Sequence, residues 1–206
     1  MSVIFVILEI ISLLFLLKII HKDTDLNISF NKKDYVYILI TQCLNNILIL
    51  NIDSIYVAIF MSISLAFLSI AALIDKKTML VYTFPTYIFI VLTVILDSFS
   101  RNQFSIKSLI VYSFPIIFGL LKAYGRGDIP MVMIIGGITY LETFNIEYSI
   151  LIECVMIFIT EIIFIIKAII EKNMDGPFKL KEKRPLGPSI LIATYIVILL
   201  REVMFL

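Results

Sequence analysis

The stretch that decides the fold runs from residue 55 to residue 77 and reads IYVAIFMSISLAFLSIAALIDKK. Its first 20 residues contain no charged side chain. About 20 consecutive apolar residues are what one α-helix needs to cross the hydrocarbon core of a bilayer. The sequence therefore predicts a membrane-spanning helix over 54–74, closed by Asp75 and two lysines.

The same apolar character extends over the whole chain of 206 residues, of which 61% are hydrophobic and 16% are charged. The mean hydropathy is +1.06, whereas soluble domains are about 45–50% apolar and about 25% charged. This composition excludes a water-soluble globule and leaves no room for a sizeable soluble domain. No internal repeat or low-complexity linker divides the chain, so we expect one integral-membrane domain over residues 1–206.

Long apolar runs separated by polar residues predict an all-α bundle of about eight transmembrane helices. The first run carries its lysine at the end rather than at the start, unlike a cleaved signal peptide, so we expect it to remain as a span. The second run contains Gln42, Asn45 and Asn46. The sixth contains Gly136 and Gly137, and either run is compatible with a short or tilted segment inside the bundle. The eight predicted spans are 2–20, 35–52, 54–74, 81–97, 107–124, 129–146, 149–170 and 188–206.

Basic residues favour one side of this predicted topology. Short cytoplasmic loops of membrane proteins collect lysine and arginine. Of the 17 basic residues, only Arg101, Lys107 and Arg201 fall on one side, and the other 14 share the loops after spans 1, 3, 5 and 7. We therefore expect those loops to be cytoplasmic and both termini to lie outside. The 14 residues are Lys18, Lys22, Lys32, Lys33, Lys76, Lys77, Lys122, Arg126, Lys167, Lys172, Lys179, Lys181, Lys183 and Arg184.

Net charge and rare residue types disfavour several other classes of function. A net charge of +1 does not supply the basic surface that a nucleic-acid partner requires. His21 is the single histidine of the chain, and we expect it to be a solvated residue at a helix end. Cys43 and Cys154 lie in separate apolar runs, so the spacing offers neither a zinc site nor a disulfide framework. We therefore expect no metal and no cofactor.

Two aspartates stand out by their position at span ends. Asp75 closes the third predicted span, and Asp128 follows the fifth in the segment Gly125-Arg126-Gly127-Asp128. The predicted topology places both carboxylates at the cytoplasmic membrane edge, at the same depth. Two carboxylates held close together tend to share one proton, so that one acts as a general base on water while the other donates to a carbonyl oxygen. This is the chemistry of an aspartic protease.

Both aspartates also have a purely structural interpretation. An aspartate beside Lys76 and Lys77 at a membrane edge is often a solvated loop residue. The glycines that bracket Arg126 are typical of a sharp turn, and Asp128 stands where the N-cap of the next helix belongs, with Pro130 in its first turn. Residue patterns alone leave a glycine turn with a helix cap and a catalytic motif as equal alternatives.

At these positions the chain resembles the GxGD intramembrane aspartic proteases, and within them the type IV prepilin leader peptidases. The family's first catalytic aspartate follows Leu-Ile, here Leu73-Ile74-Asp75, and its second closes Gly-x-Gly-Asp, here residues 125–128. A Pro-Phe-Gly-Pro segment often leads into the last span of members, and this chain has Pro185-Leu186-Gly187-Pro188. The likeness runs from about Ser69 to Tyr195, in the expected order.

The resemblance implies a multi-pass endopeptidase of the bacterial inner membrane that uses Asp75 and Asp128 as catalytic residues. Its substrates would be prepilins or pseudopilins with a hydrophobic N-terminal helix, cut at the cytoplasmic face to remove a short basic leader. The glycines would admit an extended substrate backbone, and the prolines would stiffen a loop beside the dyad. The implied substrate-binding residues are Gly125, Gly127, Pro185, Gly187 and Pro188.

The sequence departs from the family pattern in three places. Pro130 stands where the family usually has lysine after the second aspartate, and Leu80-Val81-Tyr82 replaces an Ile-Pro after the first. The loop from His21 to Asp34 lacks the CxxC pairs of bifunctional members, whose zinc module is implicated in N-methylation. We therefore expect a peptidase without methyltransferase activity.

Three glutamates inside predicted spans support a rival hypothesis. Glu9, Glu153 and Glu161 lie in apolar runs, where an ionisable side chain is costly unless it faces the bundle interior. A small transporter or channel would use them as a proton or cation relay, and the aspartates would then be loop residues. A third hypothesis, an inactive relative that scaffolds pilus assembly, rests on Pro130 alone.

Overall fold

A computed structural model describes residues 2–22, 28–79, 85–102, 106–120, 128–171 and 185–204. Within these ranges the chain forms eight α-helices and no strand, which confirms the all-α class and the order of the predicted helices. The helices are α1 (Ser2–Lys22), α2 (Lys32–Leu50), α3 (Ile55–Thr78), α4 (Pro85–Arg101), α5 (Ser108–Leu120), α6 (Ile129–Thr143), α7 (Ile146–Ile170) and α8 (Gly187–Met204).

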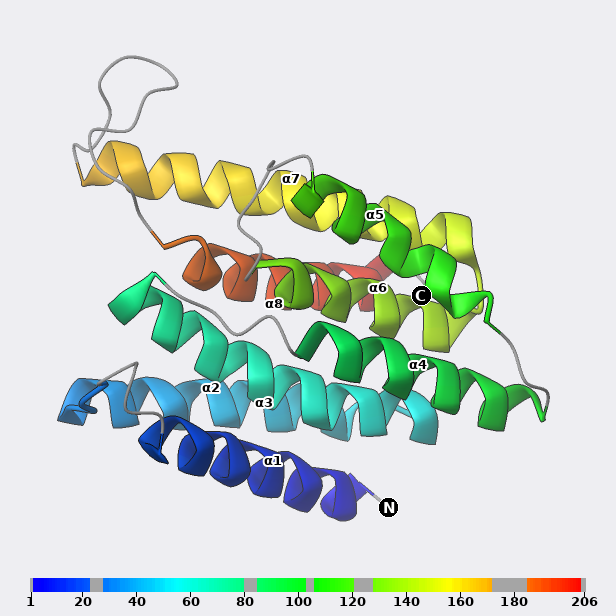
Figure 1. Cartoon of the computed structure of the whole chain (residues 1–206), viewed down its shortest axis with the longest axis horizontal. Helices are drawn as coiled ribbons and strands as arrows, with labels where there is room; N and C mark the ends of the chain where they lie inside the picture. The colour runs from blue at the N-terminus through cyan, green and yellow to red at the C-terminus, as the bar shows by residue number, and fades with distance from the viewer. Residues whose placement is uncertain are drawn as a thin grey trace.

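The helices lie side by side along one long axis, as Figure 1 shows. Helix α3 is the centre of the arrangement because it packs against α1, α2, α4, α6 and α8. Helix α7 packs against α5, α6 and α8. Helices α1 and α7 therefore lie on opposite sides of the bundle (Figure 1).

The core is formed by α3 and α6. In α3 almost every residue from Val57 to Asp75 is buried, and in α6 every residue from Pro130 to Leu141 is buried. A helix that is apolar on all sides is expected in the interior of a bundle. The phenylalanine rings of α3 and α4 meet there, with ring centroids of Phe67 and Phe89 5.4 Å apart. The apolar stretch 55–77, which forms α3, is thus surrounded by other helices.

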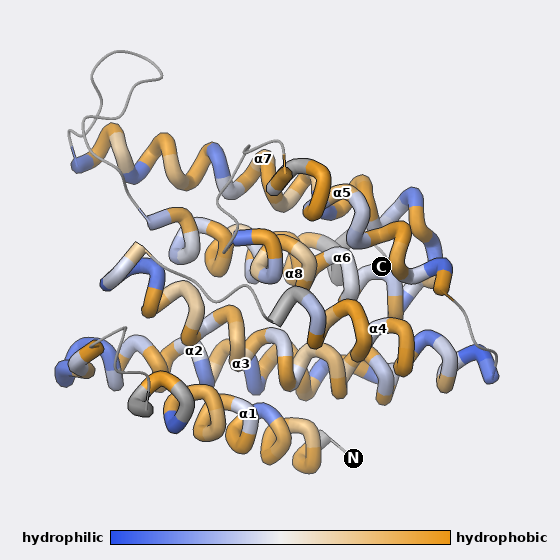
Figure 2. Tube along the Cα trace, in the orientation of Figure 1, coloured by the Kyte–Doolittle hydropathy of each residue, from blue (hydrophilic) through white to orange (hydrophobic). Residues whose placement is uncertain are grey.

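The outer helices present apolar side chains outward. Leu39 on α2, Phe158 on α7 and Val3 on α1 are each more than 60% exposed, and Figure 2 shows that hydrophobic residues predominate along α1 and α7. Helices α3 and α7 are long and apolar enough to cross a membrane. An exterior of this kind needs lipid or another protein to cover it.

Local signals explain where the helices begin and end. A capping box between Asn31 and Asp34 starts α2, because each side chain accepts a hydrogen bond from the other residue's backbone N–H. Helix α3 ends at Met79, which takes a left-handed φ of 56° and donates its N–H to the carbonyl of Asp75. This stop places Asp75 in the last turn of α3.

The two ends of the bundle differ in which residues they carry. The last turns of α3 and α7 and the first turn of α8 lie at one end, shown at the left of Figure 1, whereas α6 begins nearer the middle of the bundle. Lys76, Lys77 and Lys167 lie at that end, whereas Arg101 and Lys107 lie at the other. The first turn of α1 and the last turn of α8 also lie at the second end. The described basic residues named here thus lie in two groups at opposite ends of the bundle.

Candidate active site

Asp75 is a buried carboxylate in contact with the start of a distant helix. Its side chain is 6% exposed, and its Oδ2 accepts a 2.7 Å hydrogen bond from the backbone N–H of Gly187. Gly187 begins α8, so the carboxylate also lies at the positive end of that helix's dipole. A solvated loop residue would show neither burial nor this partner, and that interpretation of Asp75 is wrong.

Gly187 is required by the closeness of this contact. A Cβ added there would lie 3.0 Å from Oδ2 of Asp75 and 3.2 Å from the Cα of Ala72. The second atom belongs to the backbone of α3 and cannot turn aside. The glycine therefore lets the N-terminus of α8 rest directly on the last turn of α3.

Asp128 is the N-cap residue of α6, as predicted, and is 9% exposed. Its side chain, however, makes no capping hydrogen bond to the N–H groups of the described helix. Pro130 occupies the first turn, where its missing N–H leaves no donor unsatisfied. Helices α3 and α6 pack on each other, and in Figure 1 the last turn of α3, which carries Asp75, lies farther toward the left end of the bundle than the first turn of α6, which follows Asp128.

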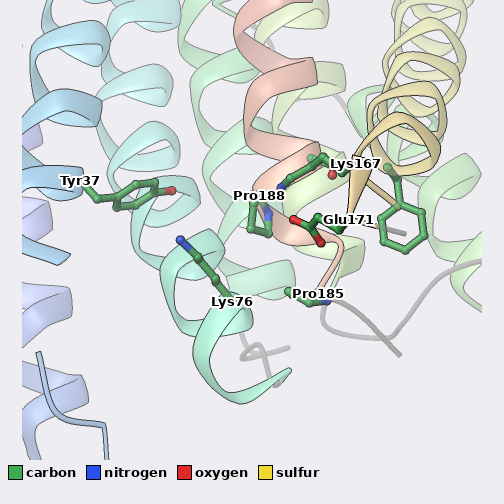
Figure 3. Close-up of a pocket in the computed structure, with 8 residues that line it drawn as sticks. Tyr37, Lys76, Lys167, Glu171, Pro185 and Pro188 are labelled. Atoms are coloured by element: carbon green, nitrogen blue, oxygen red, sulfur yellow. The ribbon is translucent and has the colours of Figure 1, made fainter. Parts of the chain in front are cut away.

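The other predicted substrate residues divide into two groups. Gly125 and Gly127 lie outside the described residues. Pro185 and Pro188 flank the Gly187 contact and line a cavity of about 240 Å³ between α2, α3, α7 and α8. Figure 3 shows Pro188 in the middle of this cavity, with Tyr37 and Lys76 on one side of it and Lys167 and Glu171 on the other. Phe164 and Ser189 complete the lining.

The three glutamates of the rival hypothesis lie in different environments. Glu9 is fully buried and accepts hydrogen bonds from the side-chain amides of Gln42 and Asn45. Glu153 is also fully buried, but neither of its oxygens has a hydrogen-bond partner within the described residues. Glu161 is exposed on α7. Since α1 and α7 lie on opposite sides of the bundle, Glu9 and Glu153 belong to separate clusters.

The carboxyl group of Glu153 occupies space provided by a glycine of α6. A Cβ added at Gly136 would lie 2.6 Å from Cδ of Glu153 and 3.0 Å from Val111. A Cβ at Gly137 would instead meet Phe60 and the hydroxyl of Tyr112, each at 2.5 Å. The two glycines thus admit bulky groups of α3, α5 and α7 to the face of α6, and α6 remains a regular helix.

Sequence reasoning missed a polar network that joins four helices. Asn45 on α2 donates to Glu9 of α1 at 2.9 Å and to Ser69 of α3 at 3.1 Å, and it accepts from the hydroxyl of Tyr195 on α8 at 2.7 Å. The signal was an amide inside an apolar run, which indicated an interior position. It did not identify the partners, because they lie up to 150 residues away.

A second missed cluster lies at the opposite end of the bundle. Asp97 is fully buried and pairs with Arg101, with Nε to Oδ1 at 2.7 Å, and Tyr140 donates to its other oxygen at 3.1 Å. The guanidinium of Arg101 also lies over the ring of Phe144, 4.5 Å from its centroid. Asp97 and Arg101 are four residues apart, the spacing at which opposite charges meet on one face of a helix, and this was the signal available in the sequence.

Metal-binding groups do not gather in the described part of the chain. Within it, no group of three or more histidine, cysteine, aspartate or glutamate residues is placed to hold an ion. Cys43 and Cys154 are free thiols on the exposed faces of α2 and α7. Comparison with protein-family models, with curated proteins and with solved structures found no match.

Proposed function

We propose that this protein is a multi-pass membrane aspartic endopeptidase in which Asp75 and Asp128 form the catalytic dyad. The observation that carries the proposal is the buried carboxylate of Asp75, which the N–H of Gly187 holds in the last turn of α3; this helix packs against α6, of which Asp128 is the N-cap residue. Burial and a fixed orientation are what a catalytic carboxylate requires. The resemblance to prepilin leader peptidases supports the same two residues.

The proposed reaction needs one protonated and one ionised carboxylate. The ionised group accepts a proton from a water molecule, whose oxygen attacks the scissile carbonyl carbon, while the protonated group donates to the carbonyl oxygen. Collapse of the tetrahedral intermediate breaks the C–N bond, and a carboxyl proton passes to the leaving nitrogen. The N–H of Gly187 fixes one oxygen of Asp75 during these steps. No metal and no covalent intermediate take part.

The proposed substrate is a prepilin-like protein with a hydrophobic helix in the bilayer and a short basic leader in the cytoplasm. The end of the bundle that carries Lys76, Lys77 and Lys167 would then face the cytoplasm, as the positive-inside rule favours. In this arrangement Gly125 and Gly127 admit the substrate backbone. Pro185 and Pro188 stiffen the segment that delivers the Gly187 N–H to Asp75.

Cleavage of a co-expressed prepilin-like substrate tests the proposal, read as a size shift on a gel. We expect wild-type protein to cut, and Asp75→Asn and Asp128→Asn to be inactive, because each change removes a carboxyl group but little volume. Asp53→Asn is the matched control, since Asp53 is exposed in the α2–α3 connection. Glu161→Gln should also cut. Cleavage that survives either dyad change refutes the mechanism.

A transporter or channel is the second candidate, and Glu153 is the observation that favours it. A fully buried acid without a hydrogen-bond partner among the described residues is a default functional candidate inside a membrane protein. Its separation from Glu9 disfavours a relay through both residues. Glu153→Gln distinguishes the two candidates, because the peptidase should keep its cleavage activity and the transporter should lose its flux.

A further inference from the structure

The cavity between α2, α3, α7 and α8 contains two hydroxyl groups that have no hydrogen-bond partner among the described residues. Ser189 is fully buried, and its Oγ makes no hydrogen bond within the described residues. The hydroxyl of Tyr37 is likewise buried and unpartnered there, and Figure 3 shows it pointing toward the middle of the cavity. Buried polar groups are nearly always hydrogen-bonded, and an unsatisfied one requires an explanation. A ligand that accepts hydrogen bonds would satisfy both.

The charged groups of the lining indicate the sign of that ligand. Among the described lining residues, Lys76 and Lys167 contribute two ammonium groups and Glu171 contributes one carboxylate, so the described lining carries a net charge of +1. Lys167 and Glu171 are one helical turn apart on α7, the spacing at which opposite charges stabilise each other. The lining thus suits a group with one negative charge and several acceptor oxygens. A phosphodiester has this charge and these acceptors.

The surroundings of the cavity indicate that the ligand also has apolar parts. Exposed apolar residues stand on α2 and α7, the two outer helices that contribute to the lining. Ile40 and Leu44 on α2 are 55% and 42% exposed, and Ile166 and Ile170 on α7 are 49% and 73% exposed. A volume of about 240 Å³ holds a phosphate and its nearest ester groups, being roughly eight times the share of one liquid water.

We propose that this cavity binds the phosphodiester headgroup of a phospholipid, with Tyr37, Ser189, Lys76 and Lys167 donating to the phosphate and the acyl chains lying along the exposed faces of α2 and α7. The cavity shares Pro185 and Pro188 with the proposed peptidase, but the recognition of phosphate by its hydroxyl and ammonium groups does not depend on the peptidase proposal. Its position next to Gly187 means that a bound lipid packs against the segment that holds Asp75.

Native mass spectrometry of the full-length protein in a neutral maltoside detergent tests the site. The protein is titrated with phosphatidylglycerol, with a diacylglycerol of the same acyl chains, and with inorganic phosphate. We expect one phosphatidylglycerol to be retained per chain, and the diacylglycerol to bind at least tenfold more weakly because it lacks the phosphodiester. Inorganic phosphate should not displace the lipid at comparable concentrations.

Conservative variants locate the binding. The pair Tyr37→Phe with Ser189→Ala removes the two hydroxyls and should weaken phosphatidylglycerol binding roughly tenfold. Lys76→Gln should weaken it about fivefold, and this exposed position serves as the test if the hydroxyl pair does not fold. The matched controls are Tyr35→Phe and Lys33→Gln, which make the same changes on the exposed surface of α2 and should leave the affinity unchanged.

Three results would overturn the proposal. Equal affinity for the diacylglycerol would show that the acyl chains alone are recognised. Displacement of the lipid by equimolar inorganic phosphate would assign the cavity to a soluble phosphate compound. Retained affinity in both the hydroxyl pair and Lys76→Gln would place the lipid elsewhere. None of these results bears on cleavage, so failure of this site is distinguishable from failure of the peptidase proposal.

Discussion

The backbone N–H of Gly187 donates a 2.7 Å hydrogen bond to Oδ2 of Asp75, across 112 residues of sequence. This contact fixes the start of α8 on the last turn of α3 and leaves little space for a side chain at Gly187. It also gives the glycine between Pro185 and Pro188 a structural role, because this residue supplies the donor.

The size of the side chain at position 187 should therefore control both stability and activity. In Gly187→Ala the new Cβ would be 3.2 Å from the Cα of Ala72, so we expect a loss of about 1–3 kcal/mol from overpacking. Gly187→Val should abolish the fold or the cleavage. Thermal unfolding in detergent and the cleavage assay measure the two effects. If Gly187→Val matches wild type in both, the close contact does not exist in the protein.

Gly136 and Glu153 should show a specific rescue. Gly136→Ala places a Cβ against the Glu153 carboxyl group and should destabilise the protein by about 1–3 kcal/mol. Adding Glu153→Ala removes the group that clashes and should recover part of that loss, although it leaves its own cavity. Gly137→Ala clashes with Phe60 and Tyr112 instead, so the same second change should not rescue it. Melting temperatures of the four variants check the pattern, and equal rescue of both glycine variants would contradict the geometry.

Asn45 should be the most sensitive residue of the network on α1, α2, α3 and α8. Asn45→Ala leaves the carboxyl group of Glu9 and the hydroxyl of Tyr195 each without one partner. An unsatisfied buried polar group costs about 1–3 kcal/mol. The neighbouring Asn46, which accepts a hydrogen bond from Gln42, is the control, and Asn46→Ala should cost less. Unfolding by a graded denaturing detergent compares the two, and equal loss would show that the network does not hold the helices together.

The capping box at the start of α2 predicts a pH dependence. Burial alone would raise the pKa of the Asp34 carboxyl group, but the Asn31 N–H and the Lys77 ammonium group outweigh it and hold that pKa below its ordinary value. A carboxyl group with a lowered folded pKa contributes stability above its unfolded pKa of about 3.9, and this contribution is lost as the pH falls further.

The difference in melting temperature between wild type and Asp34→Asn measures this contribution. We expect wild type to be the more stable at pH 7 and the difference to shrink between about pH 5 and pH 3. Lys77→Gln should reduce the difference at pH 7, since it removes one of the causes of the lowered pKa. A difference that stays constant over this range would mean that Asp34 does not titrate with folding.

The sequence determined the number, order and approximate bounds of the helices. These are local properties, because apolar run length, capping residues and turn residues act over a few neighbouring positions. The placement of Asp75 in the last turn of one helix and of Asp128 at the start of another followed from the same signals. Local pattern alone could not decide whether the side chain of Asp128 caps α6. In the structure it makes no capping hydrogen bond.

Only the tertiary structure decided which faces of the helices meet. When a helix is apolar on all sides, as α3 and α6 are, its sequence has no polar face to indicate the direction of the core. The sequence therefore could not identify the partner of Asp75. It also could not show that Glu9 and Glu153 are buried whereas Glu161 is exposed. They depend on packing between segments far apart in sequence. The missing side chain of Gly187 lets the start of α8 approach the backbone of α3, and that of Gly136 leaves room for the Glu153 carboxyl group.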